Sequence, residues 1–138
     1  MKLVEPAIEY LMSVWIRKAD GDLRAAEVLA ANVPTDGAIR EAVGFHCQQA
    51  VEKYVKALLT FYQVEFPKTH EIKKLLLLLG TVNPAAADAL DGTHWLTPFG
   101  VDVRYADDAA QMLPGDEIRA IESARLAKDV VLRILNAE

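Results

Sequence analysis

The stretch that decides the fold is DGAIREAVGFHCQQAVEKYVKALLTFY, residues 36–62, which has the periodicity of one long helix. At about 100° of rotation per residue, one set of apolar side chains falls within about 80° of the helix circumference. This core stripe consists of Val43, Cys47, Ala50, Tyr54, Ala57 and Phe61. A second apolar set extends around one flank and consists of Gly44, Val51, Val55, Leu58 and Leu59. A helix that is apolar over more than half of its circumference lies at the centre of a bundle or packs on a second subunit.

Helical periodicity and capping signals predict further helices on both sides of this central one, whose start Asp36 can cap. The first is expected to begin near Pro6 and to end at about Asn32, with Gly21 as the place where it could bend or break. The others are expected from Thr69 to Leu79 with Gly80 as the stop, from Asn83-Pro84 to about Leu96, and from Pro114-Gly115-Asp116 onwards, with residues 97–113 mainly loop. The sequence therefore predicts an all-α fold, an antiparallel up-down bundle of four to five helices, as a single domain over residues 1–138.

Composition narrows the class of protein further. The chain of 138 residues is 52% hydrophobic with a formal net charge of −5, which excludes disorder and argues against broad, sequence-blind binding to nucleic acid. Cys47 is the only cysteine, so no internal disulfide forms and a reducing cytoplasm is the expected location. The first residues lack the apolar segment of a signal peptide, and the uncharged stretch from Leu75 to Ala87 is too short to cross a bilayer. We expect a soluble cytoplasmic protein.

Four polar residues line the other flank of residues 36–62 as one ridge: His46, Gln49, Lys53 and Lys56. Two ammonium groups, an imidazole and an amide offer hydrogen-bond donors over three turns of helix and could hold an anion. The alternative is a solvated helix face, on which Glu52 and Lys56 form an ordinary ion pair four residues apart. The spacing alone favours the solvated face.

The run FHCQQAVEKYVKALL from Phe45 to Leu59 resembles the central helix of the HEPN family, helical domains named for their presence in higher eukaryotes and prokaryotes. The matching positions outside this run are Trp15, Ala19, Asp22, Leu23 and Ala26, then Thr69-His70, then Arg104-Tyr105, so the resemblance spans about residues 13–136. It implies an up-down helical bundle that is often dimeric and is linked to nucleotide or RNA. It also implies pairing with a small nucleotidyltransferase, in some relatives as a toxin–antitoxin couple.

The ribonuclease branch of that family uses an arginine that is followed, after four to six residues, by a histidine. Such a pair transfers a proton and stabilises charge on the phosphate without a metal. After Arg104 this chain has alanine or glutamine at residues 109–111, where the histidine would stand. Arg40 and His46 satisfy the bare spacing, but on one helix they point about 120° apart. We therefore expect no intrinsic ribonuclease activity.

Two residues outside the ridge complete the candidate site. His70, at the expected start of a helix, either makes a loop-to-helix hydrogen bond or faces a ligand beside the positive helix end. Arg104 either caps a helix or pairs with a nearby acid. The resemblance to the family implies instead that Arg104 faces the ridge, where its planar guanidinium group suits phosphate. The three histidines and Cys47 lack the spacing of metal ligands, so we expect no metal and no cofactor.

These observations support one leading hypothesis and two alternatives. The leading hypothesis is a non-catalytic HEPN-type module that binds a nucleotide or RNA end beside a partner nucleotidyltransferase. Its expected nucleotide-binding residues are His46, Gln49, Lys53, Lys56, His70 and Arg104. The first alternative is a metal-free ribonuclease toxin that uses Arg104 or Arg40 with His46, and the second is a structural dimeric adaptor. The apolar flank of residues 36–62 also predicts a homodimer or a higher even oligomer.

Overall fold

The computed structural model describes residues 5–100 and 111–137, and every regular element in these ranges is helical. The elements are α1 (Pro6–Ala30), the 3₁₀ turn η1 (Gly37–Ile39), α2 (Arg40–Phe61), α3 (Ile72–Gly80), α4 (Pro84–Leu90), the 3₁₀ segment η2 (Asp91–Phe99) and α5 (Asp116–Ala137). The all-α bundle expected from the sequence is confirmed. None of the helices in the described ranges combines the length and the apolar character that a bilayer crossing needs.

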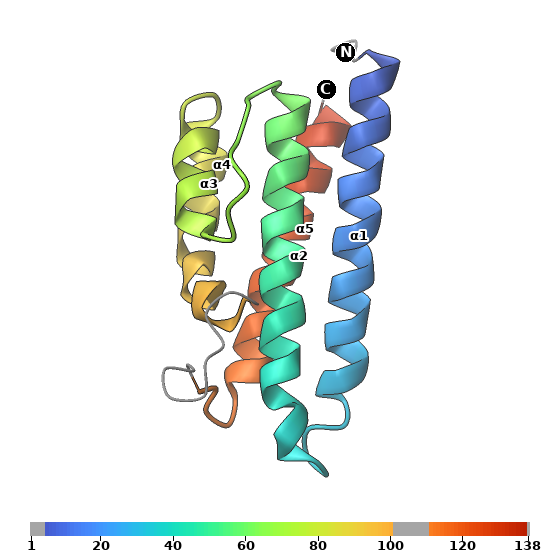
Figure 1. Cartoon of the computed structure of the whole chain (residues 1–138), viewed down its shortest axis with the longest axis vertical. Coiled ribbons are helices and arrows are strands. Elements are labelled where there is room, and N and C mark those ends of the chain that lie inside the picture. Colours follow the sequence, from blue (N-terminus) through green and yellow to red (C-terminus); the bar gives the residue numbers. More distant parts are fainter. Residues whose placement is uncertain (1–4, 101–110, 138) are drawn as a thin grey trace.

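α2 is the central element of the bundle. Figure 1 shows it between α1 and the α3–α4 pair, with α5 behind it, and α2 contacts α1, α3, η2 and α5. α1 and α2 run antiparallel, and the segment 62–71 then turns back along α2 (Figure 1). Because of this return, α3 runs in the same direction as α2, while α4 and η2 run in the opposite direction and α5 reverses again. Directions therefore alternate along α1, α2, the α4–η2 stretch and α5, and α3, which runs parallel to α2, is the exception.

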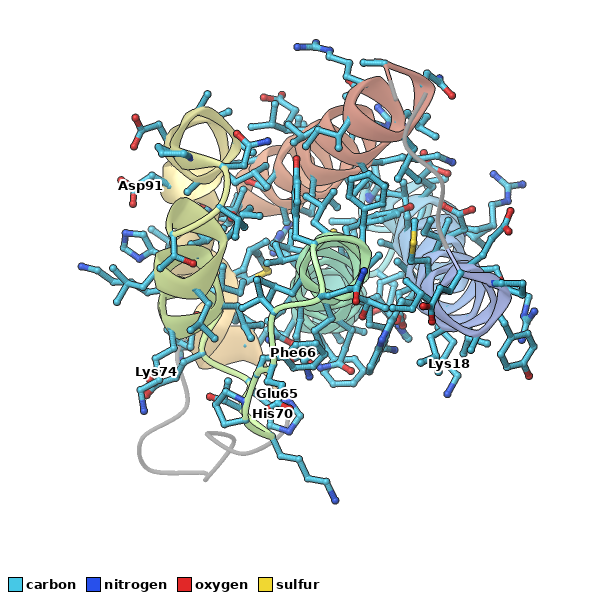
Figure 2. The ribbon with its side chains drawn as sticks, turned by 90° about the horizontal axis from the view of Figure 1, so that it is seen from above. Lys18, Glu65, Phe66, His70, Lys74 and Asp91 are labelled. Carbon is cyan, nitrogen blue, oxygen red and sulfur yellow. The ribbon has the colours of Figure 1, made fainter. Side chains whose placement is uncertain are left out.

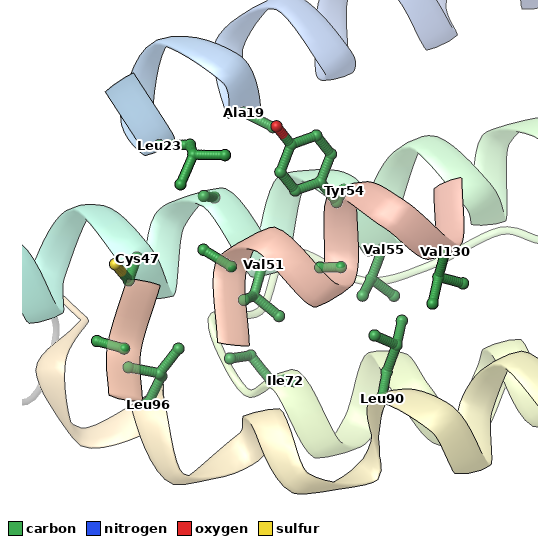
Figure 3. Packing of buried hydrophobic residues seen from close by; sticks show 14 of the residues in the cluster. Ala19, Leu23, Cys47, Val51, Tyr54, Val55, Ile72, Leu90, Leu96 and Val130 are labelled. Atoms are coloured by element: carbon green, nitrogen blue, oxygen red, sulfur yellow. The ribbon is translucent and has the colours of Figure 1, made fainter. Parts of the chain in front are cut away.

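The core is built around the apolar surface of α2. Both predicted apolar sets of this helix are buried: Val43, Gly44, Cys47, Ala50, Val51, Tyr54, Val55, Ala57, Leu58, Leu59 and Phe61. Figure 3 shows part of this cluster, to which the surrounding elements contribute Leu23, Ile72, Leu96 and Val130. The flank that suggested a second subunit is thus covered by the other helices of the same chain. The homodimer stays a prediction, without support from this surface.

Two predicted capping residues act at helix starts. The Asp36 side chain accepts a hydrogen bond from the Ala38 amide at 3.1 Å. It therefore caps the short turn η1, and α2 itself begins at Arg40. The Asn83 side chain accepts from the Ala86 amide at 3.0 Å and caps α4 as predicted. Short polar side chains at these positions satisfy amides that a helix start leaves without a partner.

Three details of the predicted helices are wrong. Thr69 does not cap α3, because its hydroxyl accepts from the Glu71 amide and the chain stays extended until α3 begins at Ile72. Gly21 does not break α1, which is continuous through it. The fourth helix is α-helical only as far as Leu90 and then continues as the 3₁₀ segment η2, since the glycine and proline within that segment disfavour a regular α-helix.

Candidate functional site

Asp22 of α1 holds two of the ridge residues in one cluster. Its carboxylate accepts a hydrogen bond from Nζ of Lys53 at 2.5 Å and lies 2.9 Å from Nδ1 of His46. The three side chains are largely covered by the surrounding structure. The cluster links α2 to α1. Lys53 and His46, which the sequence predicted to bind an anion, therefore already contact a carboxylate of the chain itself.

A second cluster surrounds Glu52, whose side chain is only 4% exposed. The carboxylate accepts hydrogen bonds from Nζ of Lys56 at 2.9 Å and from Nε2 of Gln48 at 3.1 Å, and it lies 2.8 Å from Nδ1 of His70. Nε2 of Gln48 also donates to the backbone carbonyl of His70 at 3.1 Å. We call Gln48, Glu52, Lys56 and His70 the Glu52 cluster. It holds the segment 62–71 against α2.

Lys56 is a buried cation. Its side chain is 9% exposed, and Nζ lies 5.4 Å from the ring centre of Trp15 and 5.8 Å from that of Phe66. The aromatic faces attract the ammonium group, and the Glu52 carboxylate balances its charge. The predicted Glu52–Lys56 pair is thus confirmed. The solvated-face interpretation is wrong for this residue, because α1 and the segment 62–71 cover it.

Gln49 connects to the Glu52 cluster through its neighbour. Nε2 of Gln49 donates to Oε1 of Gln48 at 2.7 Å. Gln48 is fully buried, and it is not among the site residues predicted from the sequence. It lies on the apolar flank of α2, and a glutamine in such a position indicates a buried hydrogen-bonded contact, because an unsatisfied amide there is costly. A glutamine among the apolar residues of this flank is therefore a sequence signal that could have identified Gln48 as a site residue.

A pocket with a volume of about 600 Å³ lies beside the Glu52 cluster. Among the described residues, its lining contains Lys56, Lys68, Thr69, His70, Glu71, Lys74, Thr97 and Gly100. Figure 2 shows His70 and Lys74 on the same side of the bundle. The volume lies within the range of about 300–1,000 Å³ that is usual for small-molecule sites. The segment 62–71, α3 and η2 together form this concave surface.

Lysine side chains give the described part of the pocket lining a surplus of positive charge. Lys56 is balanced by Glu52, and Lys74 lies 3.2 Å from Glu71 in an exposed pair. Lys68 is exposed and forms no ion pair with another residue of the ranges 5–100 and 111–137. The surplus positive charge therefore lies in the pocket, at Lys68, and not on the part of the ridge that Asp22 neutralises.

Arg40 and His46 do not converge. Nε of Arg40 lies 2.9 Å from Oε1 of Glu117 on α5, while His46 contacts Asp22 on α1. Burial acts to raise the pKa of Glu117, but hydrogen bonds from its own amide, from Arg40 and from the Gly115 amide outweigh burial and hold this pKa below its ordinary value. The ionised carboxylate therefore holds Arg40 on α5. Within one chain these two residues do not form a ribonuclease pair.

Three further observations concern Cys47, metal binding and Arg104. Burial raises the pKa of Cys47 to about 12, so the thiol is protonated at neutral pH and is not a nucleophile. Among the residues that the structure describes, no group of three or more His, Cys, Asp and Glu side chains is placed to hold a metal ion. Arg104 lies outside the described residues, and its contact with the ridge stays a prediction.

The fold and the site together define a class of protein: an all-α bundle whose central helix carries a buried Gln–Glu–Lys network beside an electropositive pocket. The family model of the HEPN domain matches residues 12–136. The chain belongs to the HEPN family, and it is thereby a nucleotide- or RNA-related module. No curated protein and no solved structure gives a significant match to this chain.

Proposed function

We propose that the chain is a non-catalytic HEPN module that binds a nucleotide or an RNA end in the pocket beside the Glu52 cluster. The observation that carries this proposal is the pocket itself, which has a volume of about 600 Å³ and, in the part of its lining that the structure describes, three lysines and one histidine. Basic side chains around a concave site are well suited to phosphate. A nucleotidyltransferase partner, in some relatives one half of a toxin–antitoxin couple, belongs to the same proposal.

The proposal moves the centre of the site from the ridge to the pocket. His46 and Lys53 share the carboxylate of Asp22, so their net attraction for an anion is small. Lys56 and His70 line the pocket and are held in place by the Glu52 cluster. Arg104 follows the pocket residue Gly100 by four positions in the sequence and stays a proposed phosphate contact.

Titration of isotope-labelled protein with mono- and dinucleotides, followed by NMR, tests this function. We expect shifts concentrated at the amides of Thr69, Thr97 and Gly100, and binding that Arg104→Ala weakens by about tenfold, since a charged contact contributes about 1.5–3 kcal/mol. Lys53→Ala serves as the comparison and is expected to change Kd by less than about twofold, because Asp22 offsets this lysine. Shifts confined to the ridge would move the site back to it. An absence of binding to any nucleotide or RNA would reject the proposal.

We expect no cleavage of RNA by the purified chain in the presence of a metal chelator. The reason is the separation of Arg40 and His46 onto different partners, together with the lack of a histidine at residues 109–111. Incubation with labelled RNA, with the His46→Ala variant in parallel, measures this. Robust cleavage that resists the chelator and is lost in His46→Ala would contradict the expectation and support the ribonuclease alternative.

A further inference from the structure

We propose that the pocket recognises the phosphate and ribose of its ligand and does not distinguish the base. This inference rests on the proposed nucleotide binding and specifies which part of the nucleotide the pocket contacts. A free nucleoside monophosphate and the phosphorylated end of an RNA chain present the same chemistry to such a site. The experiments below separate these two sources.

The two threonine hydroxyls of the pocket are placed as donors. Oγ1 of Thr97 accepts from the Ile72 amide at 3.3 Å, and Oγ1 of Thr69 accepts from the Glu71 amide at 3.1 Å. A hydroxyl that accepts a hydrogen bond in this way keeps its own proton for another acceptor. Both threonines line the pocket. They therefore offer protons to the oxygens of a phosphate or a ribose.

Ammonium groups supply the charge that a phosphate needs. Lys56, Lys68 and Lys74 carry three donors each and no acceptor. Two carboxylates, those of Glu52 and Glu71, pair with them, so one positive charge remains in surplus among the lining residues that the structure describes. A lining in which donors predominate complements an anion with several acceptor oxygens. It complements the edge of a base less well, because base edges mix donors with acceptors.

The described lining also lacks a surface on which a base could stack. Proteins that read unpaired bases place them on aromatic or guanidinium planes. The only ring in the described lining is the imidazole of His70, and Glu52 holds it through Nδ1 at 2.8 Å. The rings of Trp15 and Phe66 face Nζ of Lys56. With Arg104 proposed as a contact to the phosphate, base identity is therefore expected to contribute little to affinity.

Calorimetric titration with the four nucleoside monophosphates and with the four matching nucleosides tests the inference. The monophosphates are expected to bind with Kd values within about threefold of one another. Each nucleoside is expected to bind at least about tenfold more weakly than its monophosphate, because it lacks the charged contacts. Inorganic phosphate is expected to compete with all four monophosphates.

Variants of two neighbouring lysines show whether the pocket is responsible. Lys68→Ala and Lys74→Ala are expected to weaken monophosphate binding, Lys68→Ala by about tenfold and Lys74→Ala by less, since Glu71 already balances Lys74. Lys73→Ala is the matched control. Lys73 is also exposed and adjoins Lys74 in α3, but it lines a separate groove with Leu77 and Ala87. Its replacement is expected to leave Kd within about twofold.

A short RNA with and without a terminal phosphate separates the two sources of the ligand. Tighter binding of the phosphorylated RNA than of the monophosphate assigns the pocket to RNA ends, and the reverse assigns it to free nucleotides. Nucleosides that bind as tightly as monophosphates, or a preference of more than about tenfold for one base, would overturn the inference and leave nucleotide binding intact. Equal effects of Lys73→Ala and Lys68→Ala would overturn the assignment to this pocket. Failure of every nucleotide and RNA to bind would overturn both proposals.

Discussion

Replacement of Glu52 with alanine is expected to lower the free energy of unfolding by about 3–5 kcal/mol, because it removes one partner of a buried ion pair. The carboxylate balances Lys56, whose side chain is only 9% exposed. The carboxylate also accepts a hydrogen bond from Gln48, which is fully buried and would lose this acceptor in the variant. The cost is therefore the penalty of leaving a cation and an amide buried with fewer partners.

Urea denaturation followed by circular dichroism measures this effect. Glu71→Ala is the matched control, because Glu71 forms an exposed pair with Lys74 and its loss should cost less than about 1 kcal/mol. A second variant, Glu52→Leu combined with Lys56→Met, removes both charges and is expected to recover part of the stability. If Glu52→Ala were no more costly than Glu71→Ala, the Glu52 cluster would have no stabilising role.

The Glu52 cluster also joins the stability of the bundle to the geometry of the pocket. Glu52 and Gln48 lie on α2, while His70 belongs to the segment 62–71 and lines the pocket. Gln48 contacts the backbone carbonyl of His70, so the position of the segment depends on an amide that the core encloses. Loss of this contact is expected to displace the pocket lining even where the helices remain folded.

The fold could be predicted from the sequence because its dominant signals are local. The periodicity of residues 36–62 predicts the long helix that the structure shows as η1 and α2, and Asn83 caps α4 where its side chain indicated. The expected α3 start at Thr69 was wrong, because a threonine in an extended segment can satisfy a nearby amide as readily as it caps a helix. Capping residues mark a helix start only when the backbone after them is helical.

The candidate site was predictable only in part, because tertiary contacts decide which charges are available. Helical spacing identified the Glu52–Lys56 pair, and the structure confirms it. Spacing along one helix could not show that Asp22 of α1 neutralises Lys53. Nor could it bring Lys68 into the site, since the return of the segment 62–71 along α2 has no periodic signal.

Five consecutive leucines, residues 75–79, provide the second large expected effect, although their identical side chains give no sign of which are buried. The structure separates them. Leu75 is fully buried, whereas Leu77 is 67% exposed on the outer face of α3. Leu75→Ala is expected to lower the free energy of unfolding by about 2–5 kcal/mol, because it removes buried methyl groups and leaves a cavity. Leu77→Ala is expected to change it by less than about 0.5 kcal/mol.

The comparison is well matched, because both changes are leucine to alanine within one helix and helix propensity alters little between these residues. Denaturation of the two variants, at protein concentrations that differ tenfold, measures the difference. A similar loss for Leu77→Ala would contradict the expectation and would mean that the outer face of α3 is covered in solution. Covering by a second copy of the chain would make the stability rise with protein concentration. Equal stabilities at both concentrations, with a loss confined to Leu75→Ala, would establish that α3 buries only its inner face.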